Sequence, residues 1–372
     1  MTKQTHKQGS TDPGTPQAGS TCITRRTFLH KSLLAGAAVA GGGALNFFDS
    51  FTAIDVAHAA ESFTFAWVSD THLYPKTLNT RFVEKATRAF QDIQAMGSKF
   101  DFMIFGGDLA QLGDPVELQL GSELLKDVKI KKYFIPGEHD WYLDMGAQWN
   151  KMFGESPWKF DYKGVRFIGL NTVGQAPDYW SAKHMTPAER MGHMATLDGS
   201  VAGPWSGLGH KQLQWLQSAL SDWDKSKPVI VFTHTPLYDY YPPWNFWVRD
   251  WREAQEILRP FKNVTNFHGH VHQVAYNEIG NMRFFAQLAT SWPWPYPPTG
   301  VPTLTKAMIR VDPGDPFDGV GWGQLGIAGD RTSQEYKMWR KEVFATNEWD
   351  SGTGDNDNQV LRPRIADRAW PY

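Results

Sequence analysis

The chain has 372 residues, of which 41% are hydrophobic and 14% are aromatic, and its formal net charge is -2. This apolar content excludes a mostly disordered chain, and the interspersed charges leave no basic stripe of the kind that binding along a nucleic-acid backbone requires. We therefore expect a packed globular protein that does not bind nucleic acid.

Residues 1–59 are predicted to be a targeting segment that takes no part in the fold. A polar leader precedes the residues TRRTFL at 24–29, and a weakly apolar run rich in Ala and Gly follows at 32–48. This order resembles a bacterial twin-arginine export signal, and the sequence AHA at 57–59 fits a small-x-small cleavage site. The resemblance implies transport by the twin-arginine translocase to the periplasm or cell envelope. The alternative is an uncleaved membrane anchor with a chance Arg-Arg pair.

The single cysteine, Cys22, lies inside this targeting segment. The mature chain is therefore expected to form no disulfide and to offer no thiolate ligand. No later run approaches the roughly 18 apolar residues of a membrane-spanning helix. We expect no stable membrane span in the mature chain.

Short apolar runs that end in polar residues are predicted to be buried strands. They lie at 63–69, 102–105, 133–135, 165–170, 229–233 and 264–267. Stretches with apolar residues at three- and four-residue steps are predicted helices, and these lie at 80–96, 115–126 and 210–223. Strands that alternate with helices indicate an α/β fold. The later runs 282–288 and 303–311 lack intervening helices, which predicts antiparallel strands and therefore mixed sheets.

Two segments, 174–209 and the tail 312–372, show no apolar period and are expected to be irregular. Two loops, 238–247 and 292–296, are unusually aromatic, and either cover a core edge or line a pocket. The expected domain layout is a signal peptide at 1–59, one catalytic domain at 60–311, and a C-terminal extension at 312–372 packed on the same domain.

Five polar clusters follow the predicted strands, at the edge where open α/β sheets bind ligands. They are Asp70-Thr71-His72, Gly107-Asp108, Gly137-Glu138-His139-Asp140, His234 and Gly269-His270-Val271-His272. Carboxylates and imidazoles are the protein ligands that Mn, Fe and Zn accept. A single such cluster is more often a helix cap or a satisfied polar group, so the prediction of a metal centre depends on the whole set.

The ordered motifs D-x-H, G-D, G-E-H-D, H and G-H-x-H resemble the calcineurin-like metallophosphoesterase superfamily, from Asp70 to His272. The resemblance implies an α/β fold, a four-layer α/β/β/α sandwich of two mixed β-sheets, and a cofactor of two metal ions drawn from Fe, Mn or Zn. It divides the ligands between the ions, with Asp70, His72 and His272 on one, His234 and His270 on the other, and Asp108 on both. The family's third motif has an Asn that completes the second site, and here that position is Glu138.

Two ions about 3.5 to 4 Å apart can hold a hydroxide between them and clamp phosphoryl oxygens for in-line attack. The expected function is therefore hydrolysis of a small-molecule phosphomonoester or phosphodiester. By resemblance, His139 protonates the leaving oxygen or holds the phosphate. Asp140 is predicted to orient His139 by accepting a hydrogen bond from its other ring nitrogen.

The carboxylate of Glu138 adds one negative charge to the ligand set where the family has a neutral amide. This change favours a harder or higher-valent ion in the second site, or a monoanionic diester substrate. The alternative is that Glu138 is simply another oxygen ligand with little effect. Gln111 stands where the iron-zinc purple acid phosphatases of the family have a tyrosine, which argues against a tyrosinate-iron site.

The aromatic loop that follows His234 is the candidate for substrate binding. Tyr241, Trp244 and Trp247 are predicted to stack on a base, sugar or aryl group, and Arg249 to pair with a phosphate. The alternatives are packing over the sheet edge and an ordinary surface salt bridge.

Two other function classes compete with the hydrolase. One is a catalytically impaired metal-binding or scaffold protein of the same fold, in which Glu138 in place of the family's Asn would mark the loss of activity. An exported oxidoreductase is the other, and the lack of cysteines and of a dinucleotide glycine motif in the mature chain argues against it.

Overall fold

The computed structural model describes residues 60–75, 80–174, 186–189, 206–240, 247–272, 275–292, 309–310, 317, 319–329, 331–339, 343–345, 360–361 and 367–371. The chain divides into two units after Asp55, and all of these residues belong to the second unit, Val56–Tyr372. The predicted signal peptide lies outside the described residues. Among the helices described, none has the length and apolar character that crossing a bilayer demands.

Six strands form the first sheet, in the order β15-β12-β11-β1-β2-β3. Their bounds are β1 Ala60–Val68, β2 Phe102–Phe105, β3 Lys131–Phe134, β11 Gly321–Gly329, β12 Arg331–Met338 and β15 Asp367–Pro371. β1, β2 and β3 are parallel, whereas β11 pairs antiparallel with β1 and is followed by antiparallel β12 and β15. The sheet is therefore mixed, and the C-terminal segment supplies three of its strands.

The second sheet also has six strands, in the order β4-β5-β6-β7-β9-β8. Their bounds are β4 Trp158–Tyr162, β5 Val165–Gly169, β6 Val229–Thr233, β7 Val264–His268, β8 Ala275–Ile279 and β9 Met282–Ala286. The four central strands are parallel, and the edge strands β4 and β8 are antiparallel to their neighbours. A separate small antiparallel sheet contains β10 Ile309–Arg310, β13 Val343–Ala345 and β14 Val360–Leu361.

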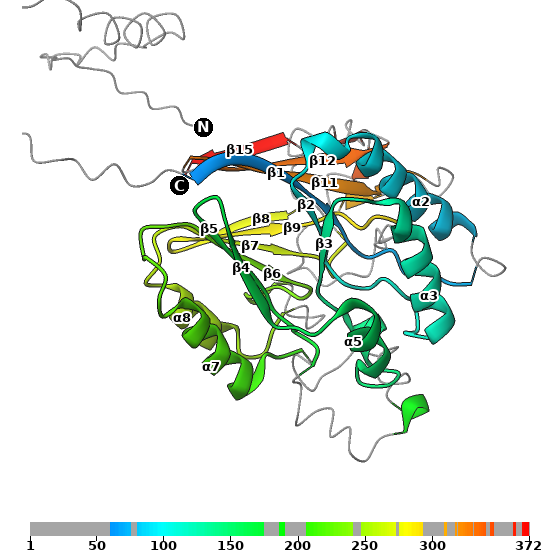
Figure 1. The fold of residues 1–372 in the computed structure, drawn as a ribbon, viewed down its shortest axis with the longest axis horizontal. Coiled ribbons are helices and arrows are strands. Elements are labelled where there is room, and N and C mark those ends of the chain that lie inside the picture. The colour runs from blue at the N-terminus through cyan, green and yellow to red at the C-terminus, as the bar shows by residue number, and fades with distance from the viewer. Residues whose placement is uncertain are drawn as a thin grey trace, which may run out of the picture. The chain divides into compact units, whose positions relative to one another are not determined.

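Helices cover the outer face of each large sheet (Figure 1). On the first sheet they are α2 Thr80–Ala95, α3 Pro115–Leu124 and α5 Ala147–Phe153, and on the second they are α7 Gly209–Leu220 and α8 Trp251–Leu258. The remaining short helices are α4 Glu138–Trp141, η1 Gly97–Lys99 and η2 Leu125–Asp127. The predicted four-layer α/β/β/α sandwich of two mixed sheets is confirmed.

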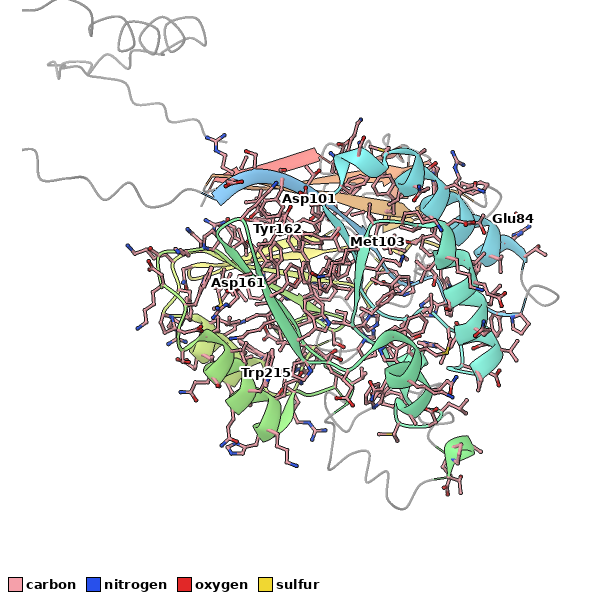
Figure 2. The ribbon with its side chains drawn as sticks, viewed as in Figure 1. Glu84, Asp101, Met103, Asp161, Tyr162 and Trp215 are labelled. Carbon is pink, nitrogen blue, oxygen red and sulfur yellow. The ribbon has the colours of Figure 1, made fainter. Side chains whose placement is uncertain are left out.

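Strand β1 shows why the buried strands are continuously apolar in the sequence. Phe63, Phe65 and Trp67 point into the core between the two sheets, where side chains fill the space (Figure 2). Ala66 and Val68 point the other way, into the core beneath the helices. Because successive side chains of a strand alternate between faces, a strand buried on both faces needs apolar residues throughout.

The sheets confirm one expectation from sequence in part and correct another. The run at 282–288 forms β9, which pairs antiparallel with β8, as predicted, and parallel with β7 on its other side. The tail beyond residue 312 is not wholly irregular, since it contains β11 and β12. In β11, Leu325 and Ile327 pack into the core between the sheets and Trp322 into the core beneath the helices, while the glycines of this strand interrupt the apolar pattern in the sequence.

Candidate metal centre

The seven predicted ligands lie just beyond the carboxyl ends of five parallel strands. Asp70 and His72 follow β1, Asp108 follows β2, Glu138 follows β3, His234 follows β6, and His270 and His272 follow β7. All seven side chains are buried. The two sheets thus bring together ligands from residues 70 to 272, at the end of the strands where α/β folds place their sites.

The backbone at most of these predicted ligands has a strained conformation that residues with a side chain rarely adopt. Five ligands have positive φ angles, namely Asp70 at 57°, His72 at 43°, Asp108 at 52°, His270 at 66° and His272 at 51°. Each such conformation costs on the order of 1 kcal/mol or more and persists only where the surroundings enforce it. Backbone hydrogen bonds do so here, because the amides of Asp70 and His72 donate to the carbonyls of Gly107 and Asp108 over 2.9 and 3.0 Å.

Two glycines of the motifs leave room for the ligands. A Cβ atom at Gly137 would overlap the carboxylate of Asp108, and one at Gly107 would overlap the ring of His234. Gly107 also has a φ of 103°, which side-chain-bearing residues rarely adopt. These positions therefore require glycine for a close approach between the backbone and the ligand side chains.

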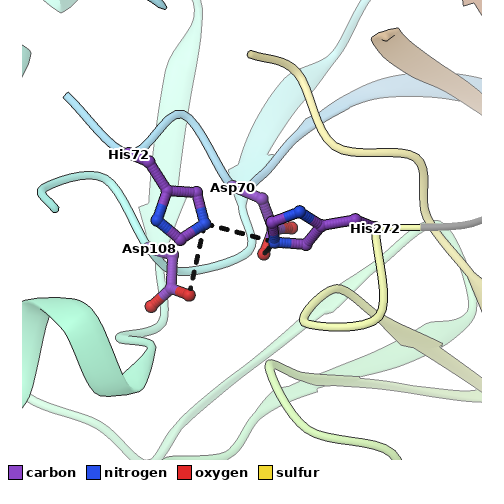
Figure 3. Close-up of side chains that lie close together, drawn as sticks. All are labelled: Asp70, His72, Asp108 and His272. Atoms are coloured by element: carbon purple, nitrogen blue, oxygen red, sulfur yellow. Dashed lines mark hydrogen bonds and ion pairs between the residues drawn. The ribbon is translucent and has the colours of Figure 1, made fainter. Parts of the chain in front are cut away.

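The first cluster consists of Asp70, His72, Asp108 and His272, which converge from separate loops (Figure 3). His272 Nε2 lies 3.2 Å from Asp70 Oδ1 and 3.2 Å from His72 Nε2, and His72 Nε2 lies 3.6 Å from Asp108 Oδ2. One ligand atom from each residue lies within 4.8 Å of all the others. Such a group of two imidazoles and two carboxylates can enclose one divalent ion.

The second cluster consists of Asp108, Glu138, His234 and His270. His234 Nε2 lies 3.1 Å from Asp108 Oδ2 and 3.0 Å from Glu138 Oε2, and His270 Nδ1 lies 2.9 Å from Glu138 Oε1. Asp108 belongs to both clusters, so its carboxylate is placed to bridge two ions. The structure therefore groups the seven residues in the same two sets as the family resemblance implies.

The buried atoms of the second cluster fit a cation. Asp108 Oδ2 and Glu138 Oε2 lie 3.1 and 3.0 Å from His234 Nε2, and apart from these contacts none of the three buried atoms has a hydrogen-bond partner. Burial, together with the neighbouring Glu138, raises the pKa of Asp108 well above its usual value. Buried polar atoms normally find partners, and like charges this close repel. A metal ion would satisfy all three atoms and neutralise the carboxylates.

Two histidines are fixed in the tautomer that metal binding needs. His72 Nδ1 contacts the side-chain oxygen of Gln111 at 2.9 Å, and His234 Nδ1 contacts the carbonyl of Gly106 at 2.8 Å. Because these oxygens accept hydrogen bonds, each Nδ1 donates to its partner, and each Nε2 is the ring nitrogen that faces the cluster. Burial, with His139 and His272 nearby, lowers the pKa of His72 well below its usual value, which keeps its ring neutral.

Gln111 is a positioning residue that the sequence reading considered only as the replacement of a tyrosine. We expect Gln111→Ala to weaken binding of the ion in the first cluster about 10- to 100-fold, because the His72 ring loses its orienting partner. Titration of the metal-free protein with Mn²⁺ measures this, and excess Mn²⁺ should restore the activity. Gln119→Ala, on the exposed side of α3, is the matched control. Equal affinity in both variants would show that Gln111 does not position the ligand.

The predicted catalytic His139 lies half-buried beside the first cluster. Its ring centre is 4.6 Å from that of His72, and its backbone amide donates to Asp108 Oδ1 over 3.0 Å. Its Nδ1 contacts the backbone carbonyl of Gln111 at 2.5 Å, so the other ring nitrogen, Nε2, is available to a substrate. Burial lowers the pKa of His139 below its usual value.

Asp140 does not have the orienting role predicted for it. Its carboxylate accepts hydrogen bonds from the amides of Ala110 and Gly137, over 2.9 and 3.1 Å, and the carbonyl of Gln111 takes its place at His139. The reason is that α4 begins at Glu138, which turns the Asp140 side chain back toward the loop after β2. Burial raises the pKa of Asp140 to about 7. Asp140 thus ties together the two loops that carry Asp108 and Glu138.

The predicted substrate-binding residues are only partly within the described part of the chain. Tyr241 and Trp244 lie outside it. Trp247 and Arg249 are described, and the carbonyl of Trp247 accepts from Ser206 Oγ over 2.9 Å while the Arg249 side chain is exposed. A role of these four residues in substrate binding stays a prediction.

An aromatic ring that the sequence reading did not assign to the site lies against the first cluster. The ring centre of Trp292 is 4.6 Å from that of His72, 5.9 Å from that of His272 and 6.4 Å from that of His139. Its position at the start of the aromatic segment 292–296 is the only sequence signal that pointed to it.

The chain is similar to several known proteins in sequence or in fold. Over 234 residues the chain is 25% identical to a 3',5'-cyclic adenosine monophosphate phosphodiesterase of Haemophilus influenzae, covering 60% of this chain and 74% of that protein. Over 217 residues it is 26% identical to a probable glycerophosphodiester phosphodiesterase of Arcobacter nitrofigilis, covering 56% and 71%. A dimetal phosphatase from Danio rerio has a similar fold, with a TM-score of 0.53 at 14% identity over 74% of this chain and 96% of that one.

Residues 63–274 match the calcineurin-like phosphoesterase family, a segment that includes all seven ligands and His139. This match spans more than half of the chain. The protein therefore belongs to the calcineurin-like phosphoesterase family.

Proposed function

We propose that this protein hydrolyses a small-molecule phosphodiester at a centre of two metal ions held by the first and second clusters. The observation that carries this proposal is the position of Asp108, whose buried carboxylate belongs to both clusters. One carboxylate shared by two sets of buried ligands is typical of a dinuclear site. The donor atoms are nitrogen and oxygen only, which suits Fe, Mn or Zn.

When bound, the two ions supply an activated water nucleophile and neutralise the charge on the phosphoryl oxygens. The protein contributes the rest. His72 and His234 are held with their Nε2 atoms toward the clusters, and His139 is held by the carbonyl of Gln111. Because Nδ1 donates to that carbonyl, His139 has to carry a second proton on Nε2, in the imidazolium form, to protonate the leaving oxygen as the bond from this oxygen to phosphorus breaks.

The test is hydrolysis with and without metal. Protein stripped of metal by a chelator should hydrolyse neither bis(4-nitrophenyl) phosphate nor 4-nitrophenyl phosphate, and addition of Mn²⁺ or Zn²⁺ should restore turnover. Failure of every metal-loaded form to act on a panel of phosphate esters would contradict the proposal. It would instead favour a metal-binding protein without turnover.

Glu138 supports the choice of a diester over a monoester. Its carboxylate is the third buried carboxylate at the two clusters, with Asp70 and Asp108, and it contacts both histidines of the second cluster. This additional negative charge disfavours a dianionic monoester more than a monoanionic diester. The two relatives described above are both named as phosphodiesterases.

We expect Glu138→Asn to raise the ratio of monoester to diester kcat/KM by about 10-fold, because it removes one buried negative charge beside the phosphate. Steady-state kinetics with the two nitrophenyl esters, at saturating metal, measure this ratio. Glu123→Asn, on the exposed side of α3, is the control. An unchanged ratio, with unchanged metal content, would mean that Glu138 acts as an ordinary oxygen ligand.

We also propose that the protein is exported by the twin-arginine pathway to the periplasm or cell envelope. The support is the sequence TRRTFL at 24–29, followed by the Ala- and Gly-rich run. Since this pathway carries folded proteins, the metal centre can be loaded before export. We expect the double variant Arg25→Lys, Arg26→Lys to remain in the cytoplasm, which cell fractionation measures, with Lys31→Arg as the control. Unchanged export of the double variant would rule out this pathway.

A further inference from the structure

We propose that Trp292 determines substrate specificity by contacting the organic group of the phosphate ester, and that it selects esters with a flat, apolar group such as an aryl ring or nucleobase. This inference rests on the proposed hydrolytic function. The Trp292 ring lies edge-to-face with the His72 ring, at 84° and 4.6 Å between centres, and near His139. It is thus next to both a predicted ligand and the predicted proton donor.

The segment that carries Trp292 is anchored to the elements around the site. The Thr290 amide donates to the carbonyl of Ser69 over 2.8 Å, next to the ligand Asp70. Ser291 Oγ donates to the carbonyl of Phe82 over 3.0 Å, and the Ser291 carbonyl accepts from Lys85 Nζ over 2.9 Å. These contacts tie the segment to β1 and α2. Trp292 therefore has a fixed position, which gives a recognition surface at low entropic cost.

The surroundings of Trp292 make one side of the site apolar. Its ring packs at 5.9 Å from the Phe82 ring. Leu112, which directly follows Gln111, is one of the few large hydrophobic side chains exposed among the described residues, at 42%. Gln111 contacts both His72 and His139, so Leu112 is the chain neighbour of a residue that touches the predicted proton donor. Apolar side chains are thus found beside the ring of His72 and next to Gln111 in the chain.

The Trp292 side chain is only partly buried, unlike the ligands beside it. A ring needed only to complete the core would be enclosed. A partly exposed aromatic ring beside a phosphate-binding centre can stack on the organic group of a substrate. Small polar alcohols such as glycerol gain little from such a surface.

The experiment compares two diesters in the metal-loaded protein. One is bis(4-nitrophenyl) phosphate, with aryl groups, and the other is glycerophosphoethanolamine, with small polar groups. We expect Trp292→Leu to lower kcat/KM for the aryl diester about 10- to 100-fold and for the glycerol diester less than about threefold. Because each substrate is compared with itself, the different intrinsic reactivities of the two esters cancel. Trp292→Phe should retain most of the aryl activity.

Trp215→Leu is the matched control, because Trp215 is a partly buried tryptophan on α7, away from the site. Metal content is measured for every variant. Equal losses on both diesters, or loss of bound metal, would overturn the proposal and show that Trp292 only packs the first cluster. A native protein that prefers the glycerol diester would overturn it as well. If the native protein hydrolyses neither diester with any metal, it is the proposed function that fails.

Discussion

Asp108→Asn should lower kcat/KM for all phosphate esters by about 10³-fold or more, the largest effect expected for any single ligand. The Asp108 carboxylate is shared by both clusters, so its replacement removes a buried negative charge from two sites at once. A neutral amide offers one carbonyl oxygen and one NH₂ group and so cannot bridge two cations as a carboxylate does. Steady-state kinetics and elemental analysis of the purified variant measure the two consequences.

Comparison with Asp70→Asn distinguishes bridging from simple ligation. Asp70 belongs only to the first cluster, so its variant should lose one ion, whereas Asp108→Asn should bind both ions more weakly. Asp114→Asn is the control for the amide substitution itself, because Asp114 caps α3 and Asn caps a helix about equally well. If Asp108→Asn kept two tightly bound ions and near-native kcat/KM, the shared-carboxylate centre would be wrong.

The predictable part of the fold is the part whose residues are buried on both faces. The runs at 102–105 and 229–233 coincide with β2 and β6, since a strand enclosed by helices on one side and a second sheet on the other must be apolar at every position. The edge strand β4 alternates partly buried and exposed residues and was missed, because such a short alternation resembles a loop. The direction of β9 depends on which strand it pairs with, and that is decided by the tertiary fold.

The candidate site also has a part that the sequence predicts and a part that it does not. The clustering of the seven predicted ligands was predictable, because metal binding needs carboxylates and imidazoles and because the strand ends of a parallel sheet meet at one edge. The residues that orient these side chains were not predictable. The role of Gln111 at His139 uses its backbone carbonyl, which any residue type provides, and Trp292 reaches His72 across more than 200 positions. Asp140 was misassigned because adjacency in the chain does not imply contact between side chains in a helical turn.

His139→Ala should lower kcat by about 100-fold or more for esters of alkyl alcohols, but by less than about 10-fold for 4-nitrophenyl esters. An alkoxide is a poor leaving group and needs a proton as it departs, whereas 4-nitrophenolate leaves without one. His139 is placed for this role, since the carbonyl of Gln111 holds Nδ1 and the ring lies against His72 at the edge of the first cluster. Kinetics with glycerophosphoethanolamine and bis(4-nitrophenyl) phosphate at saturating metal give the two values.

Two roles of His139, proton donation and phosphate binding, are distinguished by how much the loss of kcat differs between the two esters. If His139 only steadied the phosphoryl oxygens, both esters would lose activity equally, because the phosphoryl group is common to them. His210→Ala, at an exposed position on α7, is the matched control and should leave both rates unchanged. Since the His139 amide donates to Asp108, unaltered metal content in His139→Ala is also required before the loss is attributed to the ring. Equal losses with metal retained would therefore assign His139 to phosphate binding and leave the leaving oxygen to be protonated by solvent.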